Sequence, residues 1–521
     1  MKNTYYRRYF KRHIIRIFLL VGMLGFGQTN RETTDNSIEK NRPPNIVFLI
    51  ADDWSYPHAG VYGDKVVQTP TFDFLAREGV LFTNAYCAAP SCSPSRASIL
   101  TSRYPHQLES AGNLWSVFPD KFKNWVSILE DAGYHTGKSR KGWGPGNYQK
   151  GGYTNNPAGK DYLDFDAFLE DRKQGQPFFY WFGSQDPHRV YETNSGVKTG
   201  MDSDQIEVPD FLPNTDCVRN DIMDYFYEVE RFDRESGNIV RKLKDAGLFN
   251  NTIIVMTSDN GMPFPRAKAN LYDYGTRMPL AIYWKNGIAE PIQIESFVNL
   301  IDLGSTFLEA AGQEIPKEFE GKSLLGLIKE NTEADWKREE VFLERERHAN
   351  VRKGNLSYPS RAIRTKDFLF IWNFEPSRWP AGSPQVHQSV GQYGDIDNSI
   401  TKFLIMDMQD SSPGVDYFNL AFAKRPSEEL YDVINDPYNM HNLADKPDFR
   451  ETKNALKKQL QIWMEGTGDL RASLPKTTYW DEVLYTPNYQ MQNFDLQEEI
   501  ESYYYLKPSG SKWVEFNCKQ P

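Results

Sequence analysis

Residues 45–53, Asn-Ile-Val-Phe-Leu-Ile-Ala-Asp-Asp, set the fold that we expect for this chain. The apolar run from Ile46 to Ala51 is short, uninterrupted and followed at once by two acidic residues. Such a run is typical of a strand that is buried on both faces of a parallel sheet. Similar runs follow at 177–183, 251–258 and 280–284.

Helical patterns separate these runs. We expect helices over 71–78, from about Pro94 onward, and over 125–132, 221–246 and 297–311. The alternation of strands and helices favours an α/β domain with a largely parallel sheet, here placed over 43–340.

The pattern changes after about residue 335. Isolated strand-like runs at 366–374 and 428–437 precede an amphipathic helix over 448–465. We expect a smaller, mostly antiparallel C-terminal α+β domain over 341–521. The chain has 521 residues, 39% of them hydrophobic, which is enough apolar material for two cores.

The N-terminal segment differs from the rest of the chain. An apolar run from Ile17 to Phe26 is surrounded and preceded by basic residues: Lys2, Arg7, Arg8, Lys11, Arg12 and Arg16. This pattern predicts a signal peptide over 1–27 and a polar lead-in over 28–42, with an uncleaved anchor as the alternative. We therefore expect a periplasmic or secreted protein that is not an integral membrane protein once processed.

The charge balance limits the partners. Sixty basic against 70 acidic residues give a net charge of -10, so nucleic acid is not an expected partner. If the ligand is anionic, basic residues or a metal must be concentrated locally at its site.

Polar residues follow two of the predicted strands at their carboxyl ends, where open parallel sheets bind ligands. Asp52 and Asp53 follow the first strand, and Asp259 and Asn260 follow the run at 251–258. These side chains are hard oxygen ligands for Ca²⁺ or Mg²⁺, although turn or helix-cap chemistry is the alternative. The cysteines and the eight scattered histidines show no zinc-type spacing.

The segment Cys-Ser-Pro-Ser-Arg-Ala-Ser-Ile-Leu-Thr at 92–101 predicts a helix whose N-terminus carries Cys92. Pro94 favours the first turn, backbone N–H groups there attract anions, and Arg96 can reach the same place. The alternatives are a disulfide between Cys92 and Cys87, or a buried structural thiol. Too few cysteines, with Cys217 and Cys518 the others, are present for a disulfide framework.

The 92–102 segment resembles the signature of the type I sulfatases, whose Cys-x-Pro-x-Arg cysteine is oxidised to formylglycine. Residues 45–53, 133–136 and 258–261 resemble the family's metal and lysine strands. The segments at 184–189 (SQDPHR), 208–215 (VPDFLPNT) and 258–265 (SDNGMPFP) are most similar to the heparan N-sulfatase (sulfamidase) branch, and the C-terminal ELYD and DPYNMHNLA also match.

The resemblance implies an alkaline-phosphatase-like fold and a formylglycine made from Cys92 by a maturation enzyme. Its hydrated form would attack sulfur, and the aldehyde would return when sulfate leaves. The implied Ca²⁺ ligands are Asp52, Asp53, Asp259, Asn260 and the modified Cys92. The implied catalytic residues are Cys92, Arg96, Lys141, His188 and Lys268, with His188 protonating the leaving group.

This chain departs from the family pattern at two positions. Trp143 stands where a histidine is expected after Lys141, and Lys268 stands where the sulfamidase branch has an arginine. A phosphatase or phosphodiesterase of the same superfamily, a cysteine hydrolase and an inactive carbohydrate-binding relative are the competing hypotheses.

The predicted substrate is a sulfated polysaccharide or oligosaccharide, either of an algal type such as ulvan or of the heparin type with N-sulfoglucosamine. Trp143, Arg189, Arg345, Arg347 and His348 are predicted to form a cationic, partly aromatic rim that binds a polyanionic sugar chain.

Overall fold

The computed structural model describes residues 42–330, 336–385, 391–409 and 414–482. The predicted signal peptide, the polar lead-in up to residue 41, Cys518 and the tail after residue 482 lie outside the described residues. No helix in the described ranges is long and apolar enough to cross a membrane.

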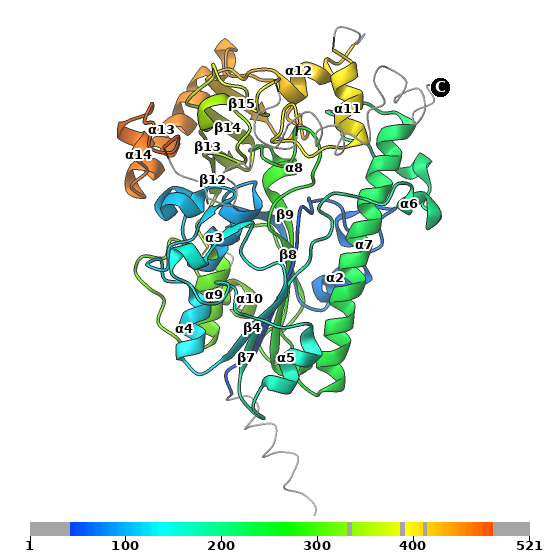
Figure 1. Cartoon of the computed structure of the whole chain (residues 1–521), viewed down its shortest axis with the longest axis vertical. Helices are drawn as coiled ribbons and strands as arrows, with labels where there is room; N and C mark the ends of the chain where they lie inside the picture. Colours follow the sequence, from blue (N-terminus) through cyan, green and yellow to red (C-terminus); the bar gives the residue numbers. More distant parts are fainter. Residues whose placement is uncertain (1–41, 331–335, 386–390, 410–413, 483–521) are drawn as a thin grey trace, which may run out of the picture. The chain divides into compact units, whose positions relative to one another are not determined.

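A nine-stranded sheet is the central layer of the fold (Figure 1). Its order is β10-β2-β9-β8-β1-β7-β4-β6, with β11 paired to β2. The strands are β1 (Asn45–Ala51), β2 (Val80–Tyr86), β4 (His135–Arg140), β6 (Lys160–Asp161), β7 (Phe178–Gly183), β8 (Thr252–Ser258), β9 (Arg277–Tyr283), β10 (Ile292–Ile294) and β11 (Val298–Asn299). Only the pairs of β9 with β2 and β8 are antiparallel, so the sheet is mixed and mostly parallel.

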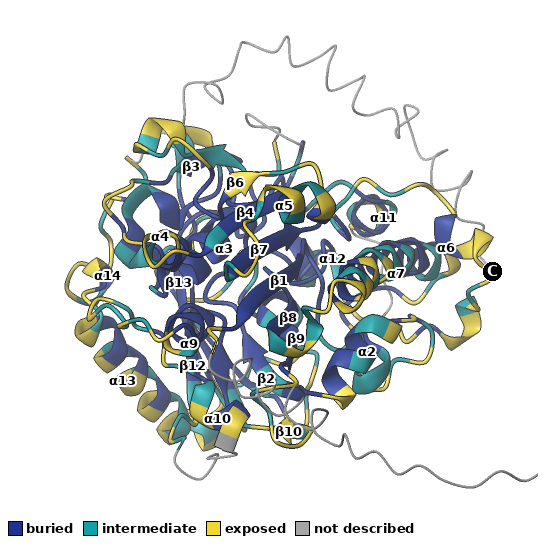
Figure 2. Cartoon of the chain, turned by 90° about the horizontal axis from the view of Figure 1, so that it is seen from below, coloured by how far each residue is buried: buried dark blue, intermediate teal, exposed yellow. Residues whose placement is uncertain are grey.

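Helices cover both faces of this sheet, on opposite sides in Figure 1. One layer contains α2 (Pro70–Arg77), α5 (Phe165–Asp171) and α7 (Asp216–Asp245), and the other contains α3 (Cys92–Thr101), α4 (Trp125–Asp131) and α9 (Asp302–Ala310). Val47 and Leu49 of β1 pack in the first core, whereas Ile46 and Phe48 pack in the second. Figure 2 shows the central strands buried between the layers. Because both faces are covered, every position of β1 is apolar except Asn45 at its start.

A separate antiparallel sheet follows, in the order β12-β13-β14-β15. Its strands are β12 (Glu340–Arg345), β13 (Ser360–Thr365), β14 (Phe368–Asn373) and β15 (Glu428–Asp432). The amphipathic helix α13 (Arg450–Gly466) packs Leu460 and Trp463 in one core with Ile363 and Phe370 of this sheet. The remaining elements are β3 (Ser116–Val117) paired with β5 (Gly146–Asn147), and α6 (Ser195–Lys198), α8 (Asp273–Thr276), α10 (Leu325–Glu330), α11 (Ile400–Asp407), α12 (Tyr417–Phe422) and α14 (Leu470–Ser473).

Two predicted elements differ in detail from the structure. The helix expected over 297–311 begins only at Asp302, because β11 first pairs with β2 and the Asp302 carboxylate accepts a hydrogen bond from the backbone N–H of Asn299. The helix expected from residue 221 begins five residues earlier, where the Thr215 side chain caps it by accepting from the Val218 N–H.

Candidate active site

The carboxyl ends of β1 and β8 place four polar side chains together. These strands pair in parallel with Ala51 opposite Ser258, so the residues that follow each strand lie side by side. Asn260 Nδ2 donates to Asp53 Oδ1 at 2.7 Å, and the backbone N–H of Asp53 donates to Asp259 Oδ1 at 3.2 Å. Carboxylate oxygens of Asp52, Asp53 and Asp259 all lie within 4.8 Å of one another.

This cluster fits a hard cation. Burial raises the pKa of Asp53 and raises that of Asp259 to about 6, because the space holds several carboxylates and little water. The buried Asn260 Oδ1 has no hydrogen-bond donor among the described residues. Three carboxylates and an orphan amide oxygen are a donor set that suits Ca²⁺ and has neither the histidine nor the thiolate ligands preferred by zinc.

Cys92 is the first residue of α3 and faces this cluster. Its Sγ donates to Asp52 Oδ1 at 3.3 Å. Burial, together with the charge of Asp52, raises the pKa of Cys92 well above its ordinary value, so the unmodified side chain stays a thiol. A cysteine hydrolase needs a thiolate, which this environment disfavours. Cys87 and Cys92 are both free, so the alternative of a disulfide between them is wrong.

Arg96 links the carboxylate cluster to the segment that carries Lys141. The side chain is fully buried, and Nε donates to Asp259 Oδ2 at 2.7 Å. Nη1 donates to the carbonyl oxygens of Lys141 and Gly142, both at 3.0 Å. Arg96 therefore fixes the end of β8 against the segment that carries Lys141.

Two ammonium groups face the carboxylates. Lys141 Nζ donates to both Asp52 oxygens, at 2.6 and 2.7 Å, and Lys268 Nζ donates to Asp53 Oδ2 at 2.7 Å. Burial alone would lower the pKa of each lysine, but the adjacent carboxylates outweigh it and raise both. Both side chains therefore stay charged.

His188 lies beside the same carboxylates. Its Nδ1 is 2.5 Å from the carbonyl oxygen of Arg189, and because a carbonyl can only accept, this hydrogen bond assigns the hydrogen to Nδ1. Nε2 lies 3.9 Å from Asp53 Oδ2. The ring is thus oriented with Nε2 toward the cluster.

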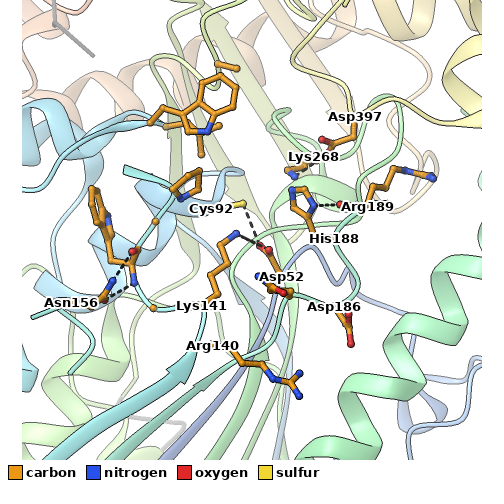
Figure 3. A pocket seen from close by; sticks show the side chains of 18 of the residues that line it. Asp52, Cys92, Arg140, Lys141, Asn156, Asp186, His188, Arg189, Lys268 and Asp397 are labelled. Atoms are coloured by element: carbon orange, nitrogen blue, oxygen red, sulfur yellow. Dashed lines mark hydrogen bonds and ion pairs between the residues drawn. The ribbon is translucent and has the colours of Figure 1, made fainter. Parts of the chain in front are cut away.

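A cavity of about 820 Å³ opens beside these residues. Figure 3 shows Cys92 and Lys141 pointing toward Asp52, with His188 nearby and Lys268 next to Asp397. Of the residues predicted to contact substrate, Trp143, Arg189 and His348 belong to the lining. A cavity of this size can take a sugar ring.

Arg345 and Arg347 lie outside this lining and do not form the cationic rim that we expected. Arg345 is buried, and its Nη2 donates to Asp395 Oδ2 at 2.5 Å and to the Pro380 carbonyl at 2.9 Å. Arg347 is also buried, and its Nη1 donates to the carbonyl of Asn355 at 2.7 Å. Both side chains are held inside the fold by protein acceptors.

Trp143 is part of the cavity wall, and it is almost fully buried. Its indole Nε1 donates to the Ser93 carbonyl at 3.1 Å, in the first turn of α3. Asn156 brackets its backbone, accepting from the Trp143 N–H and donating to its carbonyl, both at 2.9 Å. This position supports the start of α3.

Asp397 lines the cavity and was not predicted from the sequence. Its Oδ2 accepts from Lys268 Nζ at 3.0 Å. The segment Gly394–Asn398 contains no motif, and only the neighbouring acidic pair, Asp395 and Asp397, could have marked it as polar and structured.

The chain is similar to known families and proteins. A family model described as sulfatase matches residues 44–313, and one described as N-sulphoglucosamine sulphohydrolase, C-terminal, matches residues 266–379. The chain is 29% identical to an ulvan-active sulfatase of Formosa agariphila over 476 residues, covering 87% of both chains. It is 30% identical to the N-sulphoglucosamine sulphohydrolase of Homo sapiens over 475 residues, covering 82% of this chain and 91% of that protein.

Solved structures share the fold. A protein in complex with its substrate D-glucosamine-2-N,6-O-disulfate superposes with a TM-score of 0.59 at 20% identity, covering 82% of this chain and 99% of that one. A phosphonate monoester hydrolase of Silicibacter pomeroyi also gives 0.59, at 17% identity, covering 83% and 97%. At these identities the likeness describes the fold alone, which is common to enzymes of different chemistry.

Proposed function

The chain belongs to the sulfatase family, and from that membership we propose that it removes sulfate groups from a sulfated glycan. The observation that carries the proposal is the position of Cys92 at the start of α3, between a buried carboxylate cluster and two charged lysines. The relatives named for ulvan and for N-sulphoglucosamine both point to a sulfated sugar.

We further propose that Cys92 is converted to formylglycine by a maturation enzyme, and that Asp52, Asp53, Asp259 and Asn260 hold Ca²⁺ together with the modified residue. Formylglycine would supply the nucleophile, and the cation would supply positive charge for the sulfate oxygens. The position of Cys92 beside Asp52 and the orphan amide oxygen of Asn260 support both parts.

The remaining steps belong to residues of the chain. Lys141 and Lys268 donate hydrogen bonds from Nζ to the oxygens of the bound sulfate and so hold it in place. Arg96 keeps the Asp259 carboxylate aligned. His188, whose Nδ1–H is fixed by the Arg189 carbonyl, exchanges a proton through Nε2 with the leaving oxygen or nitrogen of the sugar.

The N-terminal pattern supports a further proposal, that the protein is exported to the periplasm or secreted. An extracellular location would give it access to polymers too large to enter a cell.

The test is sulfate release from defined sulfated saccharides by protein produced together with a formylglycine-generating enzyme. We expect release that requires Cys92, an aldehyde at residue 92 in peptide mass spectrometry, and no turnover by Cys92→Ala. Faster hydrolysis of a phosphate monoester than of every sulfated saccharide would favour the phosphatase hypothesis instead. Sulfate release by protein that retains the thiol at residue 92 would refute the maturation proposal.

A further inference from the structure

The cavity around Cys92 is lined by six lysine and arginine side chains, and each has an acidic partner. They are Lys138, Arg140, Lys141, Arg189, Arg231 and Lys268. The partners decide how much anionic charge the cavity can accept, because a cation already paired with a carboxylate has little left to offer a ligand.

Four of these cations pair with carboxylates that are not candidate metal ligands. The ion pairs are Arg189 with Asp221 at 2.7 Å, Arg140 with Glu235 at 2.6 Å, Arg231 with Asp186 at 2.6 Å, and Lys138 with Asp161. These four ion pairs therefore offer a ligand no uncompensated positive charge.

Lys141 and Lys268 are different, because they pair with Asp52 and Asp53. These two carboxylates are candidate cation ligands, and a bound cation would take over their charge. Lys141 would then be uncompensated, whereas Lys268 would still pair with Asp397. The two lysines and Asp397 together leave one net positive charge next to Cys92, which matches the single negative charge of one sulfate group.

Asp397 is a second carboxylate partner of Lys268, and Figure 3 shows it next to that side chain. Its segment is held rigidly, since Asp395 accepts from the Ala349 N–H at 2.9 Å and Lys402 Nζ donates to the Ile396 carbonyl at 2.7 Å. Asp397 cannot easily withdraw, so an anion placed beside it would be repelled. A sugar hydroxyl would find an acceptor there instead.

We propose that this cavity accepts a sugar ring whose single anionic group is the sulfate to be removed, and discriminates against a second sulfate or carboxylate on the same ring. The inference rests on the proposed function and narrows its substrate class. Hydroxyl groups on the other ring positions donate to Asp161, Asp186 and Asp397, which line the cavity. Further anionic rings of a polymer stay outside the cavity, so a polyanionic chain with singly charged end rings remains a substrate.

The test measures binding to Cys92→Ser protein by isothermal titration calorimetry in calcium buffer, so that no sulfate is cleaved. The probes are glucosamine N-sulfate, N-acetylglucosamine 6-O-sulfate and glucosamine 2-N,6-O-disulfate. We expect the disulfate to bind at least about tenfold more weakly than the better monosulfate, the size of effect that one unfavourable charge contact produces.

Variants that remove one negative charge from the cavity lining should reduce the ratio of the disulfate dissociation constant to that of the better monosulfate. Asp161→Asn and Asp397→Asn are each added separately to the Cys92→Ser protein. In at least one of them, this ratio of dissociation constants should fall by about threefold or more. Asp161 is exposed, so its substitution does not threaten folding. Asp166→Asn is the matched control, because Asp166 pairs with Lys242 and neither residue lines the cavity.

Equal or tighter binding of the disulfate, or a ratio that neither variant changes, overturns the inference while leaving the proposed function intact. If none of the three sugars binds, and the formylglycine-bearing enzyme releases sulfate from no sugar at all, the proposed function itself fails.

Discussion

Replacing Arg96 with methionine removes the charge that holds the buried site together while keeping most of the side-chain volume. The substitution leaves Asp259 without its cation at 2.7 Å, and it leaves the Lys141 and Gly142 carbonyls without their donor. Arg96 and Asp259 are both fully buried, so water cannot easily replace this ion pair.

Breaking a buried ion pair from one side costs about 3–5 kcal/mol. An unfolding entropy of about 2.1 cal/mol/K per residue amounts to about 1 kcal/mol/K for a chain of 521 residues. We therefore expect Arg96→Met to lower the thermal midpoint by about 3–5 °C in calcium-free buffer. Calcium should recover part of this loss, because a cation beside Asp259 supplies positive charge in place of the guanidinium.

The assay is differential scanning calorimetry of wild type and variant, with and without calcium. Arg338→Met is the matched control, since Arg338 pairs with the buried Asp302 in a comparable ion pair outside the site. We expect the decrease in the thermal midpoint of Arg338→Met to be the same with and without calcium. A midpoint lowered by less than about 1 °C in Arg96→Met, or a loss that calcium leaves unchanged, would refute this reasoning.

Three further predictions follow from the same structure. Asn260→Leu removes the orphan amide oxygen, so it should weaken calcium binding by at least about tenfold in calorimetric titration, and unchanged binding would exclude Asn260 as a ligand. Burial and the neighbouring Asp186 raise the pKa of Glu228 from 4.5 to about 8, so the folded state retains this proton and stability should fall as pH rises from 4.5 through 8. Glu228→Gln should reduce this dependence of stability on pH, measured as thermal midpoints over a pH series. A pH dependence identical to that of wild type would contradict the raised pKa of Glu228. Trp143→His should lower the thermal midpoint by about 2–4 °C without raising turnover, because it empties part of a packed wall; higher turnover at an unchanged midpoint would be the opposite result.

The large sheet and the carboxylate cluster could be predicted because their signals are local. An apolar run that ends in Asp52 and Asp53 contains both the strand and the ligands that follow it. A second run ending in Asp259 and Asn260 has the same form, and parallel pairing then brings the two ends together. The antiparallel direction of β9 could not be predicted in this way, because its residues look like those of any buried strand.

The surroundings of the site were harder to predict, because ion pairing depends on contacts distant in the sequence. Arg345 was expected at a substrate rim, yet Asp395, fifty residues later, accepts its hydrogen bond inside the fold. Arg189 lies in the cavity lining as expected, but its charge is matched by Asp221. Counting basic residues near a motif therefore overestimates the positive charge that reaches a ligand.

The tryptophan that replaces the family's histidine is explained by its position in the fold. Trp143 packs against the first turn of α3, and its indole N–H donates a hydrogen bond to the Ser93 carbonyl there. This side chain therefore supports the segment that carries Cys92. Under the proposed function, proton transfer would fall to the histidines that line the cavity, His188 and His348. Burial lowers the pKa of His348 to about 3, so that ring stays neutral, with Nδ1 2.7 Å from Ser91 Oγ. His188 is more exposed and presents Nε2 toward the carboxylate cluster. Trp143 thus contributes packing against the first turn of α3, while His188 is the ring that lies beside the carboxylate cluster and that we propose as the proton donor.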